Sequence, residues 1–544
     1  MKFAVPVRRG RAAWPVTLVC LLWLLPAWSE MPRPPSAALA SAHPLATEAG
    51  REILAAGGNA FDAAVTVAAV LAVVEPYGSG LGGGGFFLLH RAIDGFETMV
   101  DARERAPLAA TEEMYLDSAG NPVARLSREG ALAAAVPGLP AALVHLAEKY
   151  GRLPLKHTLA PAIRLARSGV PTTARYRRLA NIRREALKGA GDAARIFLDE
   201  GFGPSEGFVL RQPDLANTLE RLAARGRSGF YDGPIAQRLV QGVRAAGGIW
   251  SLKDLAEYKV VEREPMRGNY RGMRVTSAAL PSSGGTVLLQ MLALLEPFDI
   301  EALDPAARAR ILIEAMRLGY RDRAAFLGDP DFTDIDAGLL LGAEHLAHLR
   351  NELRHNLRRP ARAQAAVTEE KGRNTTHFSI LDRDGNRVAA TLSINSAFGS
   401  GFVPPGTGVL LNNEMDDFVA KPGVMNRYGL TGSDANRIAP GKRPLSSMSP
   451  TFLETPQALV LIGTPGGSRI ITMVLLASLE VAAGRGTVRD WVGLPRFHHQ
   501  YLPDVVEYEG AALSATQARE LAARGYRLKE RTTPFGNMQA VVWY

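Results

Sequence analysis

The spacing of apolar residues along the chain changes its period at Thr375. Before Thr375 the apolar positions recur mostly at helical spacing, and after it they alternate with polar ones in short runs separated by Gly and Pro. We therefore expect helices early and strands late. The stretch 61–74 is apolar nearly all round, which indicates a buried helix. The other clear helical stretches are 47–56, 139–150, 215–225 and 306–326.

Two alternating runs, 375–381 and 387–395, flank an Asp-Gly turn and predict a β-hairpin. A type I turn followed by Gly385 in the left-handed conformation gives a loop of residues 383–385. Just before this hairpin, 350–373 begins as a basic helix and becomes polar and irregular. We interpret that segment as a solvated helix followed by a linker.

The turn fixes which residues of the hairpin face one another, so that Thr375 lies opposite Ser393 and His377 opposite Thr391. One face then carries Phe378, Ile380, Val388, Ala390 and Leu392, and must be core. The other face carries Thr375, His377, Ser379, Thr391, Ser393 and Asn395. An ordinary half-solvated hairpin with Thr-rich strands is the alternative interpretation of the polar face.

Length and composition fit a globular protein. The 544 residues suggest several domains or one large layered domain, and the contents of 47% hydrophobic and 22% charged residues are ordinary. Residues 1–29 have a cationic start, a short apolar stretch and small residues before position 30, which predicts a signal peptide and a periplasmic or secreted protein. An uncleaved membrane anchor is the alternative, although the apolar stretch is short for a bilayer.

Removal of this segment bears on two possible functions, nucleic-acid binding and chemistry at a cysteine. It takes four cationic residues and no acidic ones, so the formal charge falls from +9 to +5, too little to predict binding to nucleic acid. It also takes Cys20, the only cysteine, which excludes a thiol nucleophile and a Cys-ligated zinc from the mature chain. Because no later segment has the length and hydropathy of a transmembrane helix, we expect no stable membrane anchor.

Three loops after the hairpin carry reactive or hydrogen-bonding groups. Residues 413–417 place three acids around an apolar residue, and 443–450 cluster hydroxyls beside a basic residue. Residues 464–469 form a Gly turn after an apolar strand, and such a turn can aim backbone N–H groups at an anion. With the hydroxyl of Thr375, these loops supply a candidate nucleophile, acids, small hydrogen-bonding groups and a set of N–H donors.

The same segments resemble motifs of the γ-glutamyltransferase family, and the resemblance runs from about Ala42 to near the C-terminus. Asn374-Thr375-Thr376-His377 resembles its processing site, 412–418 its acidic substrate motif, 443–450 its serine motif, 465–469 its oxyanion turn, and 101–104 the segment with its substrate-binding arginine. The resemblance implies an N-terminal-nucleophile hydrolase fold, a four-layer αββα sandwich. It also implies self-cleavage between Asn374 and Thr375 into a large subunit, 30–374, and a small catalytic subunit, 375–544, which stay together as a heterodimer.

The implied chemistry needs neither a metal nor a cofactor. Cleavage frees an α-amine on Thr375 with a reference pKa of about 7.7–8.0, and this amine can take the proton of the hydroxyl on the same residue. The threonine would then transfer the γ-glutamyl group of glutathione and related amides to water or to amino acid and peptide acceptors. A histidine or aspartate partner is not required.

The resemblance also implies roles for individual residues. Those that hold the α-carboxylate of the substrate are Arg103, Ser446 and Ser447, and those that hold its ammonium are Asn395, Glu414 and Asp417. The N–H groups for the oxyanion belong to Gly466 and Gly467, and the hydrogen-bond partner of Thr375 is Ser393, where the family usually has threonine. The resemblance further indicates that loop 422–433, with Tyr428, acts as a movable lid.

Two other motifs point to cofactors or metals and are discounted. The glycine pattern 78–83 follows a helix and precedes a strand, the reverse of a dinucleotide fold, and indicates tight packing beneath the active site. His498 and His499 would point to opposite faces of a strand and cannot easily share one ion. His377 is more typical of a structural histidine.

Two alternative functions remain. A cephalosporin-acylase-like amidase on the same fold would need a pocket for an acyl chain without an α-amino group, against which Arg103, Glu414 and Asp417 argue. An unprocessed, inactive periplasmic binding protein would run as one uncut band on a denaturing gel.

Overall fold

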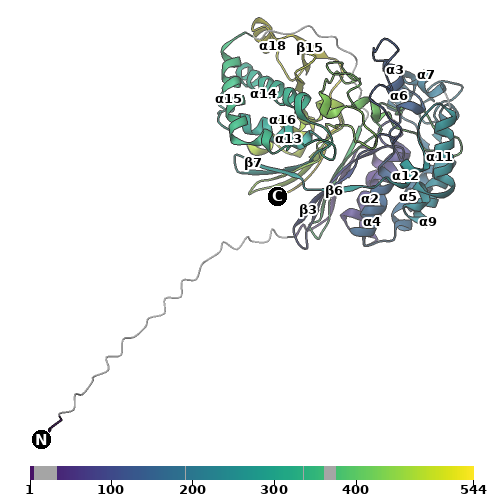
Figure 1. The fold of residues 1–544 in the computed structure, drawn as a ribbon, viewed down its shortest axis with the longest axis horizontal. Coiled ribbons are helices and arrows are strands. Elements are labelled where there is room, and N and C mark those ends of the chain that lie inside the picture. Colours follow the sequence, from purple (N-terminus) through teal and green to yellow (C-terminus); the bar gives the residue numbers. More distant parts are fainter. Residues whose placement is uncertain (5–32, 190, 335, 361–374) are drawn as a thin grey trace. The chain divides into compact units, whose positions relative to one another are not determined.

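The computed structural model describes residues 1–4, 33–189, 191–334, 336–360 and 375–544. The chain forms two compact units, Met1–Arg33 and Pro34–Tyr544, and every helix and strand given below belongs to the second (Figure 1). The signal-peptide prediction falls almost wholly on residues outside the described ranges. The same holds for most of the predicted linker and for Asn374 of the predicted cleavage site.

Strands from both sides of Thr375 build one antiparallel sheet. Its order is β1 (Ala38–Ser41), β9 (Thr375–Leu381), β10 (Arg387–Ser393), β2 (Gly84–Arg91), β3 (Phe96–Ala102) and β6 (Val261–Arg263). The hairpin β9–β10 is therefore inserted between strands that come from the first part of the chain. Both predicted subunits therefore contribute strands to this six-stranded sheet.

A second antiparallel sheet lies against the first. Its order is β16 (Gln539–Trp543), β12 (Leu459–Gly463), β11 (Thr451–Glu454), β8 (Met273–Ser277) and β7 (Met266–Tyr270). Leu88 and Ala389 of the first sheet share one buried cluster with Phe452, Leu461 and Val541 of the second. Side chains from the two sheets therefore fill the layer between them.

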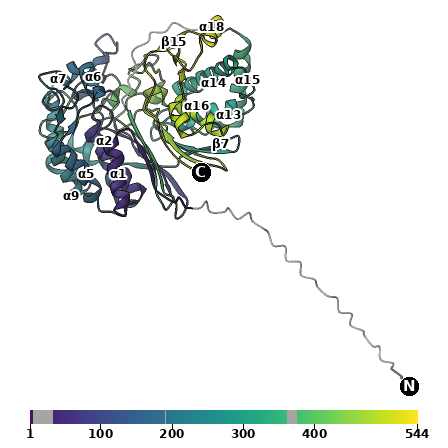
Figure 2. The ribbon, with the colours of Figure 1, turned by 180° about the vertical axis from the view of Figure 1, so that it is seen from behind.

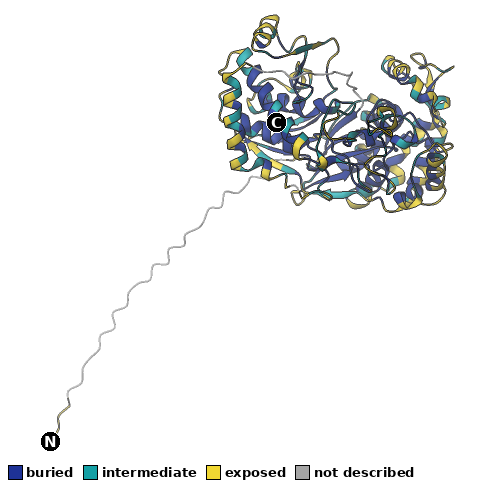
Figure 3. Cartoon of the chain, turned by 45° about the horizontal axis from the view of Figure 1, so that its top comes forward, coloured by how far each residue is buried: buried dark blue, intermediate teal, exposed yellow. Residues whose placement is uncertain are grey.

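Helices cover the two outer faces, as the views from front and back show (Figures 1 and 2). The first sheet packs in one core with α1 (Pro44–Ala55), α2 (Ala60–Val74), α4 (Leu139–Lys149), α5 (Leu155–Ser168), α9 (Pro213–Arg225) and α11 (Gly233–Ala245). The second packs with α13 (Gly284–Leu295), α14 (Pro305–Phe326), α15 (Ala343–Arg358) and α16 (Ile470–Ala482). Colouring by burial leaves the central strands of the sheets dark blue, whereas many helices carry yellow, exposed residues (Figure 3). The αββα prediction is confirmed.

Shorter elements complete the unit. The helices are α3 (Ala124–Arg128), α6 (Ala174–Ile182), α7 (Arg184–Lys188), α8 (Ala193–Phe197), α10 (Ser228–Tyr231), α12 (Leu252–Ala256), α17 (Val488–Gly493) and α18 (Ala515–Ala523). The 3₁₀ turns are η1 (Ala131–Ala133), η2 (Leu339–Leu341), η3 (Glu414–Asp417), η4 (Asp434–Asn436) and η5 (Gly467–Arg469). The remaining strands are β4 (Val170–Pro171), β5 (Val209–Leu210), β13 (Phe497–His498), β14 (Val506–Glu509) and β15 (Leu528–Arg531).

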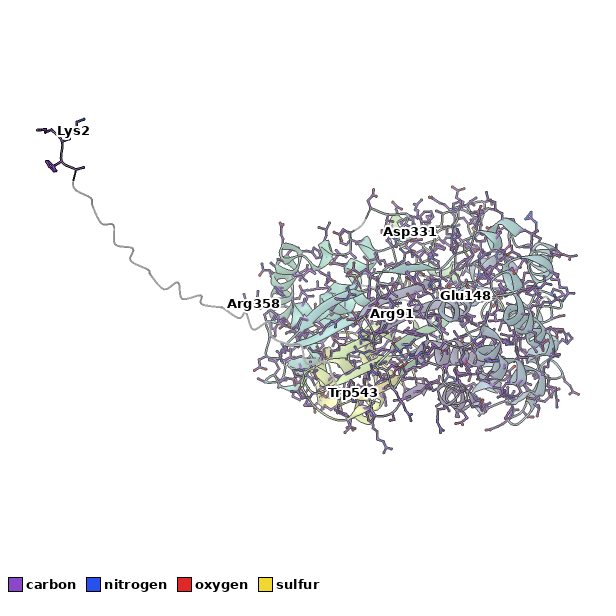
Figure 4. All side chains as sticks on the ribbon, turned by 90° about the horizontal axis from the view of Figure 1, so that it is seen from below. Lys2, Arg91, Glu148, Asp331, Arg358 and Trp543 are labelled. Carbon is purple, nitrogen blue, oxygen red and sulfur yellow. The ribbon has the colours of Figure 1, made fainter. Side chains whose placement is uncertain are left out.

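The predicted helices are present, with ends shifted by a few residues. The helix predicted at 61–74 is present as α2, which is buried on every face, as expected from its composition. The basic helix expected near 350 begins earlier, at Ala343, and ends at the exposed Arg358 (Figure 4). The earlier start is explained by Leu346, Leu349 and Leu353, whose i, i+3 and i+4 spacing buries one side of α15.

The hairpin has the predicted register and turn. Thr375 pairs with Ser393 and His377 with Thr391, and Gly385 has a φ of +91° in the turn. The alternative of a half-solvated polar face is wrong, because His377 and Thr391 are fully buried. That face points at the second sheet, where a Cβ built on Gly463 would lie 2.2 Å from Cε1 of His377.

Candidate active site

Thr375 begins the strand β9 at the mouth of the inter-sheet layer and is 7% exposed. Its Oγ1 lies 3.4 Å from Oγ of Ser393, the residue that the hairpin register places opposite. Ser393 Oγ also accepts a hydrogen bond of 2.8 Å from the N–H of Asn395. The serine hydroxyl is thereby fixed beside the threonine hydroxyl.

A cavity of about 30 Å³ opens at Thr375 and collects nearly all of the predicted site residues. Nine of the ten line it: Arg103, Thr375, Ser393, Asn395, Glu414, Asp417, Ser446, Ser447 and Gly467. Gly466 is the one that does not. A larger hollow of about 700 Å³ near the start of α14 holds none of them. Segments separated by more than 300 residues in sequence therefore meet at one place.

Arg103 is fully buried just after β3 and is bonded to both predicted acids. Its Nη1 donates to Glu414, its Nη2 donates to Asp417 at 2.5 Å, and its Nε donates to the carbonyl of Pro444 at 3.0 Å. Buried charges need such partners, because an unpaired one loses its hydration without compensation. Arg103, predicted to bind the substrate carboxylate, is thus paired with two of the residues predicted to bind its ammonium, Glu414 and Asp417.

Burial perturbs the acids around Arg103. Burial raises the pKa of Glu414 and of Asp417, and the Arg103 guanidinium opposes both shifts. Burial also raises the pKa of Glu104 to about 7, again against the pull of Arg103. No hydrogen-bond partner of either Glu104 carboxyl oxygen is found among the described residues. Glu104 stood inside a recognised motif, but the sequence assigned it no role.

The two serine hydroxyls of the serine motif differ in their hydrogen bonding. Ser446 Oγ accepts a hydrogen bond of 3.1 Å from the N–H of Met448. Ser447 Oγ is buried, and within the described part of the chain it has no hydrogen-bond partner. Since Ser447 lines the cavity, its hydroxyl is available to a ligand.

The glycine turn lies directly before a buried helix. Gly466 and Gly467 have φ values of +152° and +60°, Gly467 begins η5, and α16 follows. The N-terminal end of a helix carries partial positive charge, which favours a nearby oxyanion. A Cβ on Gly467 would lie 2.6 Å from the ring of Tyr428, so this position requires glycine.

Tyr428 and Arg323 also line the cavity. Tyr428, in the predicted lid loop, donates from its hydroxyl to the carbonyl of Asn395 at 2.9 Å and is 5% exposed. Arg323 comes from α14 and was missed by the sequence analysis, because it is one of several basic residues in a long helix without a motif. Only the folding of α14 against the second sheet brings it here.

The discounted motifs have the structural roles expected of them. The glycines 78–83 lie between α2 and β2, and a Cβ on Gly83 would lie 2.1 Å from the carbonyl oxygen of Ser393. His498 and His499 contact different partners, Thr472 and Asp504, each at 2.9 Å.

His377 is held inside the hairpin. The two ring nitrogens of His377 lie 2.8 Å from Thr391 Oγ1 and 3.2 Å from Ser379 Oγ, and burial lowers its pKa to about 3, so the ring is neutral.

Within the described ranges, no cluster of three or more metal-ligating side chains is found. No helix in those ranges combines the length and apolar character that crossing a membrane requires.

Stacked antiparallel sheets between helical layers, with a cavity at a strand-initiating threonine, define the N-terminal-nucleophile hydrolase class. The chain belongs to the γ-glutamyltranspeptidase family, whose family model matches residues 46–544. This confirms the resemblance that the motifs indicated.

Curated relatives match over most of their length. The chain is 41% identical over 528 residues to a glutathione hydrolase proenzyme of Pseudomonas sp. (strain A14), covering 95% of this chain and 91% of the relative. It is 40% identical over 510 residues to the glutathione hydrolase proenzyme of Escherichia coli (strain K12), covering 93% and 87%.

Solved structures share the fold. A cephalosporin acylase from Bacillus halodurans superposes with a TM-score of 0.80 at 27% identity, covering 99% of this chain and 96% of that one. The Helicobacter pylori γ-glutamyltranspeptidase gives a TM-score of 0.56 at 39% identity, covering 57% of this chain and 90% of that one.

Proposed function

We propose that the protein is a γ-glutamyltransferase and glutathione hydrolase that cuts itself between Asn374 and Thr375 and then uses Thr375 as its nucleophile. The observation that carries this proposal is the convergence of the predicted site residues on one cavity at the start of β9. The family membership and the names of the curated relatives support the substrate class.

The proposed reaction runs through an ester on Thr375. In self-cleavage, Oγ1 attacks the carbonyl carbon of Asn374, the peptide C–N bond breaks, and water hydrolyses the resulting ester. In turnover, the freed α-amine takes the proton of Oγ1, which attacks the γ-carbonyl of the substrate. The departing amine receives that proton, and water or an acceptor amine then releases the γ-glutamyl group.

The turn at Gly466 and Gly467 would stabilise the negative charge on the attacked carbonyl oxygen. The position of both residues at the start of η5 and ahead of α16 supports this role, because preorganised N–H groups need no rearrangement when charge develops. Ser393, 3.4 Å from Thr375, would align the threonine hydroxyl for attack.

The head group of the substrate would enter the Arg103–acid cluster. Its α-carboxylate would take donors of Arg103 and the hydroxyls of Ser446 and Ser447, while its ammonium would replace Arg103 at Glu414 and Asp417. The hydroxyl of Ser447, which is buried and has no hydrogen-bond partner among the residues that the structure describes, supports this role. Asn395 would add its side chain to the ammonium site.

After the cut, the large subunit 30–374 and the small subunit 375–544 would remain a heterodimer. The first sheet supports this, because β9 and β10 are hydrogen-bonded to β1 and β2, which lie on the other side of the cut. We propose a periplasmic or secreted location reached through the signal peptide 1–29, with glutathione as donor and amino acids or peptides as acceptors.

A cephalosporin-acylase-like amidase is the second candidate, and the TM-score of 0.80 favours it. The 41% identity to a glutathione hydrolase proenzyme, against 27% to the acylase, favours the first. The buried Arg103 with its two acids also suits a zwitterionic head group better than a plain acyl chain.

N-terminal sequencing of the purified fragments, combined with an assay on γ-glutamyl-p-nitroanilide, tests the proposal. We expect a small fragment that begins at Thr375 and an active enzyme. A fragment that begins elsewhere would refute the nucleophile assignment. A single uncut, inactive chain would favour the inactive binding protein instead.

A further inference from the structure

A second buried guanidinium, that of Arg323, lines the same cavity as Arg103. Arg323 is 4% exposed, and its Nε donates to Ser283 Oγ at 2.9 Å. No hydrogen bond is found from its two terminal nitrogens to any residue in the described ranges. Guanidinium groups carry five N–H donors, so a buried one with two open nitrogens at a cavity is prepared for an anionic partner.

The attachment of Arg323 makes its position specific. Ser283 Oγ donates in turn to the carbonyl of Ser446 at 2.7 Å, which ties Arg323 to the serine motif. One turn earlier on α14, the Tyr320 hydroxyl donates to the carbonyl of Ser468, beside the oxyanion turn. The same face of α14 thus contacts both loops that would hold the substrate.

Arg323 shares its cavity with the charged side chains of Arg103, Glu414 and Asp417. Asp417 attracts Arg323 and Arg103 repels it, while both guanidiniums favour the ionised form of Asp417. Asp417 accepts hydrogen bonds from Nη2 of Arg103 and, at 3.4 Å, from Nδ2 of Asn426. Arg323 is therefore a second cation in the cavity lined by a carboxylate that is already paired with Arg103.

Binding of a zwitterionic head group changes this pairing. Arg103 donates through Nη1 to Glu414 and through Nη2 to Asp417, so a substrate carboxylate that binds Arg103 competes with these acids for its positive charge. Asp417 must stay ionised to bind the ammonium, yet it lies in a buried site where a weakly paired carboxylate is costly.

We propose that Arg323 is a positioning residue that keeps Asp417 ionised and oriented toward the substrate ammonium once the substrate carboxylate has taken Arg103. The terminal nitrogens of Arg323 then donate to Asp417. This makes Arg323 a determinant of specificity for donors that carry an α-amino group. The inference rests on the proposed γ-glutamyl function and identifies how that site recognises the amine.

The test compares Arg323→Gln and Arg323→Lys with the parent on γ-glutamyl-p-nitroanilide and on glutaryl-p-nitroanilide, which keeps the carboxylate but lacks the amine. Arg321→Gln is the matched control, because Arg321 lies on the same helix and pairs with Glu352 outside the cavity. Binding of L-glutamate and of glutarate, measured by calorimetry, gives a second readout that needs no turnover.

We expect Arg323→Gln to raise KM for the γ-glutamyl substrate by about tenfold or more, as loss of one charge-assisted hydrogen bond implies, with a much smaller change for the glutaryl substrate. Arg323→Lys should recover part of the loss, and both variants should still cut themselves. The calorimetric affinities for glutamate and glutarate should change in the same pattern.

Equal losses on both ligands would overturn the inference, since Arg323 would then hold the carboxylate or merely support the serine loop. An Arg323→Gln variant that discriminates between the two ligands as the parent does would overturn the inference as well. A parent that neither turns over the γ-glutamyl substrate nor binds glutamate would refute the proposed function itself. A normal parent, together with an Arg323→Gln variant that loses equally on both ligands, refutes only the role of Arg323.

Discussion

Replacing Gly463 with alanine tests how closely the two sheets must approach for catalysis. Gly463 ends β12 and lies three residues before Gly466. It faces His377, which follows Thr375 by two residues. The added Cβ would lie 2.2 Å from Cε1 of His377, whereas ordinary contact begins at 3.4 Å. The ring cannot easily turn away, because Thr391 and Ser379 hold its two nitrogens.

The sheets must therefore separate locally by about 1 Å, a shift that moves Thr375 away from the oxyanion turn. A misplacement of about 1 Å can cost about 100-fold in rate, and overpacking a core typically costs about 1–3 kcal/mol in stability. We expect Gly463→Ala to cut itself slowly and to lose about 100-fold in kcat with a stable fold.

The assay is a denaturing gel for self-cleavage and kcat on γ-glutamyl-p-nitroanilide. Gly493→Ala is the matched control, because no atom lies within 4 Å of a Cβ at Gly493. Adding His377→Ala to Gly463→Ala should be non-additive, since the second change removes the ring that the first one meets. If Gly463→Ala cuts itself and turns over substrate like Gly493→Ala, the sheet-spacing argument is wrong.

Three further predictions concern the proposed chemistry. Thr375→Ala should give a folded, uncut and inactive precursor, whereas Thr375→Ser should cut itself slowly and keep some activity because serine keeps the hydroxyl but has freer rotamers; an alanine variant that still divides on a gel would point to an outside protease. Asp417→Asn should lower kcat/KM for γ-glutamyl-p-nitroanilide by an amount equivalent to about 1.5–3 kcal/mol of transition-state stabilisation, and should spare the glutaryl analogue. Equal losses would show that Asp417 does not bind the ammonium. Deleting loop 422–433 should leave self-cleavage intact and change the relative rates with small and large acceptors, and unchanged rates would contradict a lid.

Local patterns in the sequence were enough for the hairpin and for several of the long helices. The register of β9 and β10 follows from the two-residue period of a strand and from the Asp-Gly turn, both of which act over short distances. The candidate nucleophile and the acidic, serine and glycine motifs were also recognisable, because each occupies a few consecutive residues. The fold class followed from the family resemblance and is confirmed.

The tertiary structure decided how these parts interact. The sequence did not indicate that the polar face of the hairpin is buried, because that depends on a second sheet built from distant strands. The bonds of Arg103 to Glu414 and Asp417 and the approach of Arg323 were equally out of reach, since they join residues hundreds of positions apart. Charges interact strongly only where folding has removed water, so the sequence determined which groups the site contains, and only the packed structure decided their partners and protonation.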